Sequence, residues 1–329
     1  MPKGDKMELM EKLEPAIIFS AIIIGLIFSS VNVIAQNAGS LITLFLCLML
    51  YGVFLEIPLN ELKNSFKNVK FSLTSVIINF IWTPLFGYFL GSIFFKANID
   101  VFIGFFMLIL TPCTDWYLVF TKLAKGDLKL SLSILPMNLI LQIVLLPVYL
   151  VIFFSASNSM DYTQLAYSIV IVIVIPFIAA QITKFLLNDD TGERFTGLVS
   201  SAEIWFLALA VFCIFASQGK LLFSNLNSIM TIFIPLIIFF GVNVIIDLLV
   251  SEKINFTYSE YASLTMTTLA RNSPLALAIA INSFPGHELI AMALVIGPLI
   301  ELPVLYIVSK FCLRVKNSGL FFVCMNNLF

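Results

Sequence analysis

Charged residues are scarce in this chain, and their scarcity excludes most kinds of soluble protein. Only 11% of its 329 residues are Asp, Glu, Lys or Arg, whereas 60% are hydrophobic and the mean hydropathy is +1.05. Soluble domains average about 25% charged residues. The composition therefore predicts a polytopic membrane protein whose main surroundings are the lipid bilayer.

Histidines, paired cysteines and basic stripes are also lacking. The single histidine, His287, falls in an expected loop, and a lone loop histidine is poor material for acid–base catalysis. The five cysteines form no Cys-x-x-Cys pair, which argues against a zinc site or a disulfide framework. Because no basic stripe lies outside the loops, nucleic acid is not an expected partner. We expect neither an enzyme nor a bound cofactor.

Long apolar runs are what the chain has in abundance. About ten of them reach the roughly 20 residues that a helix needs to cross a bilayer. The expected spans are residues 15–34, 40–59, 71–94, 101–121, 130–154, 165–187, 199–217, 228–250, 257–283 and 288–311. Loop residues separate them, as in Gln36–Ser40 and Asn188–Gly197. The sequence thus predicts an all-α fold with ten transmembrane helices.

Lysine and arginine are distributed unevenly among the connecting segments. With the N-terminus in the cytoplasm, fifteen of the 18 fall on the cytoplasmic side, Lys96 and Lys220 fall outside, and Arg271 lies within a span. Positive residues are enriched in cytoplasmic loops. We therefore expect a multi-pass protein of the cell membrane, with both termini in the cytoplasm and an even number of spans.

Two segments look alike and suggest an internal repeat. Ile143–Val151 of the fifth span resembles Leu299–Val308 of the tenth, with Pro147 aligned to Pro303 at an offset of 156 residues. A chance match in apolar sequence is the alternative. Five spans per half is an odd number, so the second half enters the membrane inverted. The predicted halves are two inverted five-helix repeats, residues 1–157 and 158–316, followed by a short tail, 317–329.

Polar residues interrupt the fourth and ninth predicted spans. Thr111–Asp115 breaks one apolar run and Ala270–Pro274 breaks another, and the repeat offset places Asp115 opposite Arg271. Interrupted helices in matching positions of two repeats are the best sequence pointer to a transporter's binding site. We predict that helices 4 and 9 break at Pro112 and Pro274, because proline lacks a backbone N–H, and that they cross at mid-membrane.

The deep charges suggest roles in coupling. Asp115 and Arg271 either form a structural ion pair or exchange partners when a proton or a substrate binds. Glu301, bracketed by prolines in the tenth span, either carries a proton or caps freed carbonyls. Asp247 lies nearer a span end and, like Glu56 and Glu203, is expected to reach the interface. Three amides, Asn79, Asn138 and Gln142, either line a cavity or hold helices together.

Cys113 is the one thiol in these breaks. A free cysteine often behaves as a small buried hydrophobe. A helix break and a nearby arginine favour the thiolate, whereas Asp115 opposes it. Soft thiolates bind soft species such as trivalent metalloids, copper(I) and zinc. Cys113 is therefore either a substrate ligand or a packing residue.

Several motifs resemble those of the arsenite efflux permeases of the bile acid:sodium symporter superfamily. The similar residues are Cys113 in a broken fourth span, Leu123–Asp127 after it, Leu277–Ala280 and Gly297–Leu305. The resemblance implies a ten-span fold with a panel domain and a core domain, in which spans 4 and 9 cross. It also implies export of arsenite or antimonite against a proton gradient, with Cys113 essential as metalloid ligand and Glu301 contributing. The ninth-span break differs, because Arg271–Leu275 stands where those permeases carry an Asn-Asn-aromatic-Glu pattern.

Two transport functions follow for a small inorganic or anionic substrate. The first is proton-coupled efflux of arsenite or antimonite, with Cys113 at the substrate site and Asp115 or Glu301 handling protons. The second is sodium-coupled symport of a small organic anion, in which Arg271 meets the carboxylate. Its sodium would be held with the help of Thr114, Asn272 and Ser273. A membrane sensor or scaffold that moves no substrate is a third reading.

Overall fold

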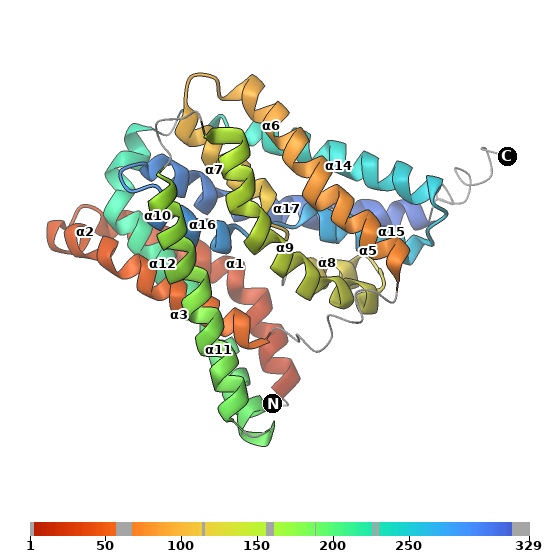
Figure 1. Cartoon of the computed structure of the whole chain (residues 1–329), viewed down its shortest axis with the longest axis horizontal. Coiled ribbons are helices and arrows are strands. Elements are labelled where there is room, and N and C mark those ends of the chain that lie inside the picture. The colour runs from red at the N-terminus through yellow and green to blue at the C-terminus, as the bar shows by residue number, and fades with distance from the viewer. Residues whose placement is uncertain are drawn as a thin grey trace. The chain divides into compact units, whose positions relative to one another are not determined.

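The chain folds into helices that form two compact units. The computed structural model describes residues 3–56, 68–113, 116–155, 161–187, 189–225, 227 and 230–317, and within these ranges every regular element is a helix (Figure 1). Unit 1 comprises Met1–Ile57, Ser157–Ile229 and Pro274–Val295. Unit 2 comprises Pro58–Ala156, Met230–Ser273 and Ile296–Phe329.

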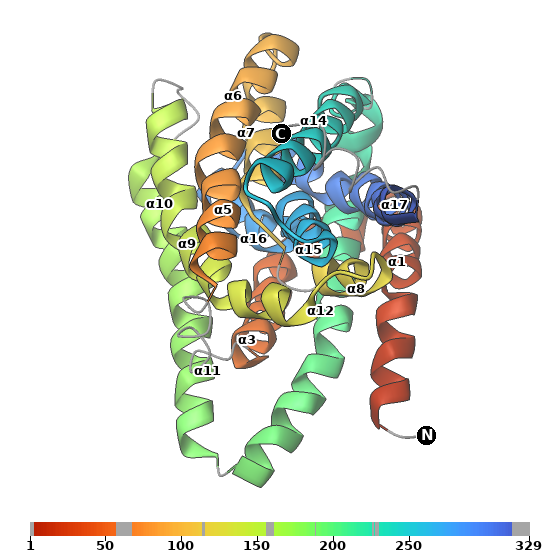
Figure 2. The same cartoon turned by 90° about the vertical axis from the view of Figure 1, so that its right-hand side faces the viewer.

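Unit 1 is organised around its longest helix, α12. Its elements are α1 (Lys3–Phe28), α2 (Asn32–Ala38), η1 (Gly39–Leu41), α3 (Ile42–Glu56), α10 (Tyr162–Ile169), the π turn η4 (Val170–Val174), α11 (Ile175–Leu186), α12 (Asp189–Ser224), most of α16 (Ser273–Ser283) and the start of α17 (Glu288–Asn317). Helix α12 packs against α1, α2 and α3, and α3 also packs against α11. The elements α10, η4 and α11 follow one another as one long helix (Figure 2).

Two expected loops are helical. Residues 36–40 lie inside one span, Asn32–Glu56, and the chain turns earlier, after Phe28. Helix α12 begins at Asp189 and covers most of the second expected loop, 188–197. Residues with low helix propensity, such as Asn, Asp and Gly, do occur within helices when tertiary packing outweighs that propensity. Loop composition therefore misplaced these two boundaries.

Unit 2 holds the break in the fourth span and residues 270–273 of the break in the ninth span. Its elements are α5 (Val69–Ile77), the π turn η3 (Ile78–Trp82), α6 (Thr83–Phe94), α7 (Ile99–Leu110), α8 (Trp116–Leu123), α9 (Leu128–Phe154), α14 (Phe233–Lys253), α15 (Tyr258–Leu269) and the rest of α17. Helix α15 packs against α5, α8, α9 and α14, and α14 also packs against α6. The central position of α15 brings the ninth-span break into the core of this unit.

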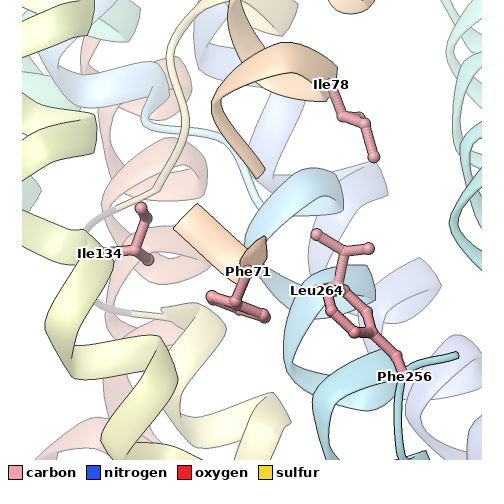
Figure 3. Packing of buried hydrophobic residues seen from close by; sticks show 5 residues of the cluster. All are labelled: Phe71, Ile78, Ile134, Phe256 and Leu264. Atoms are coloured by element: carbon pink, nitrogen blue, oxygen red, sulfur yellow. The ribbon is translucent and has the colours of Figure 1, made fainter. Parts of the chain in front are cut away.

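A small apolar cluster joins five parts of unit 2. Phe71, Ile78, Ile134, Phe256 and Leu264 are each at most 3% exposed and pack together (Figure 3). They come from α5, η3, α9, the turn before α15, and α15 itself. Burial of such side chains contributes about 1.5–3 kcal/mol each. The cluster fixes α15 against α5 and α9.

A proline explains the π turn of unit 2. Pro84 has no N–H, so the carbonyl of Phe80, four residues earlier, loses its helical partner. The Tyr149 hydroxyl of α9 donates a hydrogen bond to that carbonyl. The bond replaces the missing donor, and the span Val69–Phe94 continues without interruption.

The described residues confirm a polytopic membrane protein. Among them, seven helices are long and apolar enough to span a membrane: Asn32–Glu56, Val69–Phe94, Leu128–Phe154, Thr163–Leu186, Arg194–Lys220, Phe233–Lys253 and Glu288–Asn317. The shorter apolar helices Ala16–Phe28, Ile99–Leu110 and Ser273–Ser283 fall in the expected spans 15–34, 101–121 and 257–283. The last two of these spans are interrupted. The count of ten inverted helices stays a prediction.

The compact units are not the predicted repeats. Each unit takes stretches from both predicted halves, 1–157 and 158–316. A repeat describes ancestry and a unit describes packing, so the repeat boundaries stay a prediction. The tail 317–329 lies outside the described residues, except for Asn317 at the end of α17.

Candidate functional site

The interruptions of the fourth and ninth spans meet within unit 2. Pro112 and Arg271 form an antiparallel bridge between the two breaks. Two backbone hydrogen bonds flank this pair: the Cys113 N–H donates to the Ala270 carbonyl at 2.9 Å, and the Asn272 N–H donates to the Thr111 carbonyl at 2.6 Å. The prediction that the two breaks meet is confirmed. We call the segments 111–113 and 270–272 the crossing.

The register of the bridge explains why proline is tolerated. In an antiparallel pair, opposed residues that lie between two hydrogen bonds do not use their own N–H groups for pairing. Pro112 has no N–H to offer and occupies such a position. Arg271 occupies the other, and its N–H donates to Glu301 Oε1 at 2.7 Å. Glu301 therefore satisfies a backbone donor of the crossing.

The Arg271 side chain is enclosed by protein. It is only 2% exposed, and its guanidinium donates to Asn79 Oδ1 at 3.4 Å and to the Thr268 carbonyl. Its Cζ lies 5.0 Å from the centre of the Phe239 ring, in a cation–π contact. The Nε atom has no hydrogen-bond partner among the described residues. The crossing thus carries a fixed positive charge with one donor unused.

Asp247 is a member of the site that the sequence did not reveal. The expectation that it reaches the interface is wrong, because its side chain is 0% exposed. Its Oδ2 accepts a hydrogen bond from the Thr268 hydroxyl at 2.6 Å, and it interacts electrostatically with Arg271. The position of a residue along a span does not show whether neighbouring helices bury it. Here α14, which carries Asp247, packs against both α6 and α15. The sequence did contain a signal, because Asp247 is itself a carboxylate within an apolar run.

Cys113 lies on the crossing with its backbone fixed. It is 4% exposed and lies within electrostatic range of the Arg271 guanidinium. Next to it, the Thr111 hydroxyl donates to the Asn272 carbonyl at 3.0 Å. Among the described cysteines, Cys47, Cys113, Cys213 and Cys312 all carry unbridged thiols. The thiol and the guanidinium therefore belong to one site.

The other predicted residues are placed unevenly. Asn272 and Ser273 are buried, and Pro274 lies in the first turn of α16, where a missing N–H is not needed. Thr114 and Asp115 lie outside the described residues, so their roles, and the pairing of Asp115 with Arg271, stay predictions.

The three predicted amides differ in their contacts. Asn79 binds the ninth span twice: its Oδ1 accepts from Arg271, and its Nδ2 donates to the Thr267 carbonyl at 3.3 Å. Asn138 and Gln142, one turn apart on α9, are each 1% exposed, and neither amide has a hydrogen-bond partner among the described residues. Buried amides without partners have donors and acceptors to offer to water or to a ligand.

Interrupted helices that meet through their backbones around buried charges define a class, the membrane transporters whose sites are built from discontinuous helices. The chain belongs to the sodium bile acid symporter family, whose model matches residues 43–225. The family resemblance predicted from the motifs is thereby confirmed.

Several curated proteins are similar over most of their length. The arsenical-resistance protein Acr3 of Corynebacterium glutamicum is 23% identical, covering 92% of this chain and 88% of that protein. The arsenical-resistance protein Acr3 of Alkaliphilus metalliredigens is 24% identical, covering 84% and 82%. An uncharacterized transporter of Synechocystis, slr0944, is 23% identical, covering 94% and 90%.

Proposed function

We propose that the protein exports arsenite or antimonite across the cell membrane, coupled to proton entry, with Cys113 as the ligand of the metalloid. The observation that supports this best is the crossing, whose buried Cys113 thiol lies within electrostatic range of the buried Arg271 guanidinium. The similarity to two arsenical-resistance proteins over most of the chain agrees with it. In this proposal the metalloid is cargo, no cofactor is required and no chemical reaction is catalysed.

The chemistry of Cys113 suits a trivalent metalloid. A thiolate is a soft ligand and prefers soft acceptors. The Arg271 guanidinium lies within electrostatic range and favours a negative sulfur. Thr114, Asn272 and Ser273 would form the remaining wall of the substrate site. Asp115 and Glu301 are the carboxylates that the sequence offers for proton coupling.

The architecture proposed for this function is a ten-helix one. Two inverted five-helix repeats, residues 1–157 and 158–316, would place the crossing at mid-membrane and both termini in the cytoplasm. Units 1 and 2 would then correspond to the panel and core domains of such a transporter. The concentration of buried polar residues in unit 2 supports its role as the core.

A resistance assay tests the role of the thiol. Cys113→Ser in an arsenite-sensitive bacterial host is expected to abolish protection, because an alcohol oxygen is a hard and weak ligand for arsenic(III). Cys213→Ser is the matched control, since Cys213 is equally buried at 3% exposure but lies on α12 in unit 1. If Cys113→Ser protects as well as the parent protein at equal expression, the thiol is not the ligand.

A second function has one observation in its favour. The Arg271 Nε is buried without a hydrogen-bond partner among the described residues, and a guanidinium suits the carboxylate of a small organic anion. Coupling would then use sodium, held with help from Asn272, Ser273 and Thr114. Uptake of radiolabelled organic anions into vesicles separates the two functions, because uptake that is unchanged when choline replaces sodium excludes this one.

A further inference from the structure

The buried charges at and around the crossing do not balance. Arg271, Glu301 and Asp247 are 2%, 3% and 0% exposed, so one positive group faces two carboxylates within protein. An unbalanced charge away from water costs several kcal/mol. The set is therefore most stable when it carries one additional positive charge.

Glu301 is committed to the backbone. Its Oε1 accepts the Arg271 N–H at 2.7 Å, and this N–H has no other partner because Arg271 faces Pro112 in the bridge. A hydrogen bond from an N–H to a carboxylate is strongest when the carboxylate is ionised. Glu301 therefore acts as a positioning residue, and it stabilises the crossing most strongly when it is ionised.

Asp247 is held in a way that suits two charge states. Its Oδ2 is 2.6 Å from the Thr268 Oγ1, and its Oδ1 has no hydrogen-bond partner among the described residues. The Thr268 hydroxyl also lies 3.0 Å from the Leu264 carbonyl. When Asp247 is ionised, the hydroxyl donates to Oδ2. When Asp247 is protonated on Oδ2, it can donate to Thr268, whose own hydrogen turns to Leu264. Both states leave this hydrogen-bonded pair satisfied.

The remaining groups around Asp247 do not supply the missing positive charge. Tyr261 of α15 and Cys312 of α17 interact electrostatically with it and are neutral or negative groups. From α6, which also packs against α14, the only titratable side chain is Tyr88, whose ring lies among phenylalanine rings. Within the part of the chain that the structure describes, Arg271 is thus the cation of this neighbourhood, and both Asp247 and Glu301 interact with it.

Thr268 connects the carboxylate to the crossing. Its hydroxyl contacts Asp247, and its carbonyl accepts a hydrogen bond from the Arg271 guanidinium. It lies in the last turn of α15, directly before the break. A change of charge on Asp247 therefore acts on Arg271 both through space and through one intervening residue.

We propose that Asp247 is the carboxylate that binds and releases the coupling proton, and that Thr268 transmits its state to the crossing. The proposal rests on the proposed proton-coupled function and assigns the proton to a residue outside the two breaks. The step is an acid–base exchange: a hydronium ion on one side of the membrane gives up a proton and becomes water, an O–H bond forms on Asp247, and this bond breaks when a water molecule on the other side accepts the proton. One open oxygen suits a proton better than a metal cation, which needs several oxygen ligands.

An infrared difference spectrum tests this assignment without any substrate. The purified full-length chain is measured in two buffers on either side of neutral pH, in both of which exposed carboxylates stay ionised. The wild type is expected to show the carbonyl band of one buried carboxyl group that changes its protonation between them. Asp247→Asn is expected to lose that band, whereas Glu252→Gln, a half-buried carboxylate on the same helix, is expected to keep it. A band that persists in Asp247→Asn overturns the proposal. A band removed by sodium chloride but not by choline chloride at fixed pH also overturns it and assigns the site to sodium.

A second variant covers the case in which Asp247→Asn does not fold. Thr268→Val keeps the carboxylate and removes the hydroxyl that bonds to it, so the band is expected to shift. Thr268→Ser is expected to restore its position. A band that stays in place in Thr268→Val contradicts the role of Thr268.

Transport in vesicles separates this proposal from the proposed function. Asp247→Asn is expected to keep arsenite-for-arsenite exchange, which moves no net proton, and to lose accumulation driven by a pH gradient. If Asp247→Asn still accumulates arsenite in response to a pH gradient, Asp247 is not the residue that carries the coupling proton. If the wild-type protein moves no arsenite while its Asp247 band is present, the arsenite assignment fails and the proton site stands.

Discussion

Unit 1 and unit 2 are both bundles of apolar helices, but they bury different kinds of side chain. Among the described residues, the buried polar side chains of unit 1 are three serines: Ser29, Ser168 and Ser283. Unit 2 buries amides, many hydroxyls and the charges of Asp247, Arg271 and Glu301. Ionisable residues at membrane depth are expensive to bury and mark functional pathways. The contrast agrees with a transport site in unit 2, as proposed above.

Removing the Arg271 charge is expected to have the largest effect on unit 2. Arg271→Met leaves Glu301 and Asp247 buried without their counter-charge, which is expected to lower the free energy of unfolding by about 3–5 kcal/mol and to abolish transport. Thermal unfolding in detergent measures the first effect, and a vesicle assay measures the second.

The matched control for this loss is a lysine of unit 1. Lys184 is half-buried and interacts with the exposed Glu56, so Lys184→Met is expected to change stability by at most about 1 kcal/mol. Equal effects of the two substitutions would show that the buried charges of unit 2 are not special.

A glycine of unit 1 should give the next largest effect. A Cβ on Gly25 of α1 would lie 2.8 Å from both the Phe212 carbonyl oxygen and the Phe215 Cβ of α12. Gly25→Ala is therefore expected to destabilise unit 1 by about 1–3 kcal/mol through overpacking. Gly241→Ala on α14 is the control, because nothing lies within 4 Å of its added Cβ. Thermal unfolding that is equal for the two variants would contradict this packing.

The smallest effect is expected from single hydroxyls. Tyr149→Phe removes the donor to the Phe80 carbonyl, which Pro84 leaves without a helical partner, and should lower stability by about 1 kcal/mol. Tyr51→Phe in unit 1 should lower it less, because the hydroxyl partner, Thr183, has its own acceptor in the Ala179 carbonyl. A larger loss from Tyr51→Phe would reverse the expected order of the two units.

Much of the fold could be predicted from hydrophobicity and proline placement. The long apolar runs predicted a polytopic helical protein, and Pro112 and Arg271 marked the breaks that meet in the structure. Local composition misplaced the loops at 36–40 and 188–197, because packing can keep polar residues helical.

The site was only partly predictable for a related reason. Cys113, Arg271 and Glu301 stand out in the sequence as polar residues deep within spans. Asp247 lies nearer a span end, and the sequence therefore suggests the interface for it. Its burial depends on α15, which no property of the α14 sequence reveals. The bond from Arg271 to Glu301 follows from the register of the bridge, and register becomes visible only when both breaks are placed.

The pairing of the two breaks also limits how the protein can move. Separating the segments 111–113 and 270–272 would leave two N–H groups and two carbonyls without partners, which lipid does not tolerate. The crossing is therefore expected to stay paired during transport, while the helix ends on either side of it change position. A substrate at Cys113 would stay in place, and the path that leads to it would change.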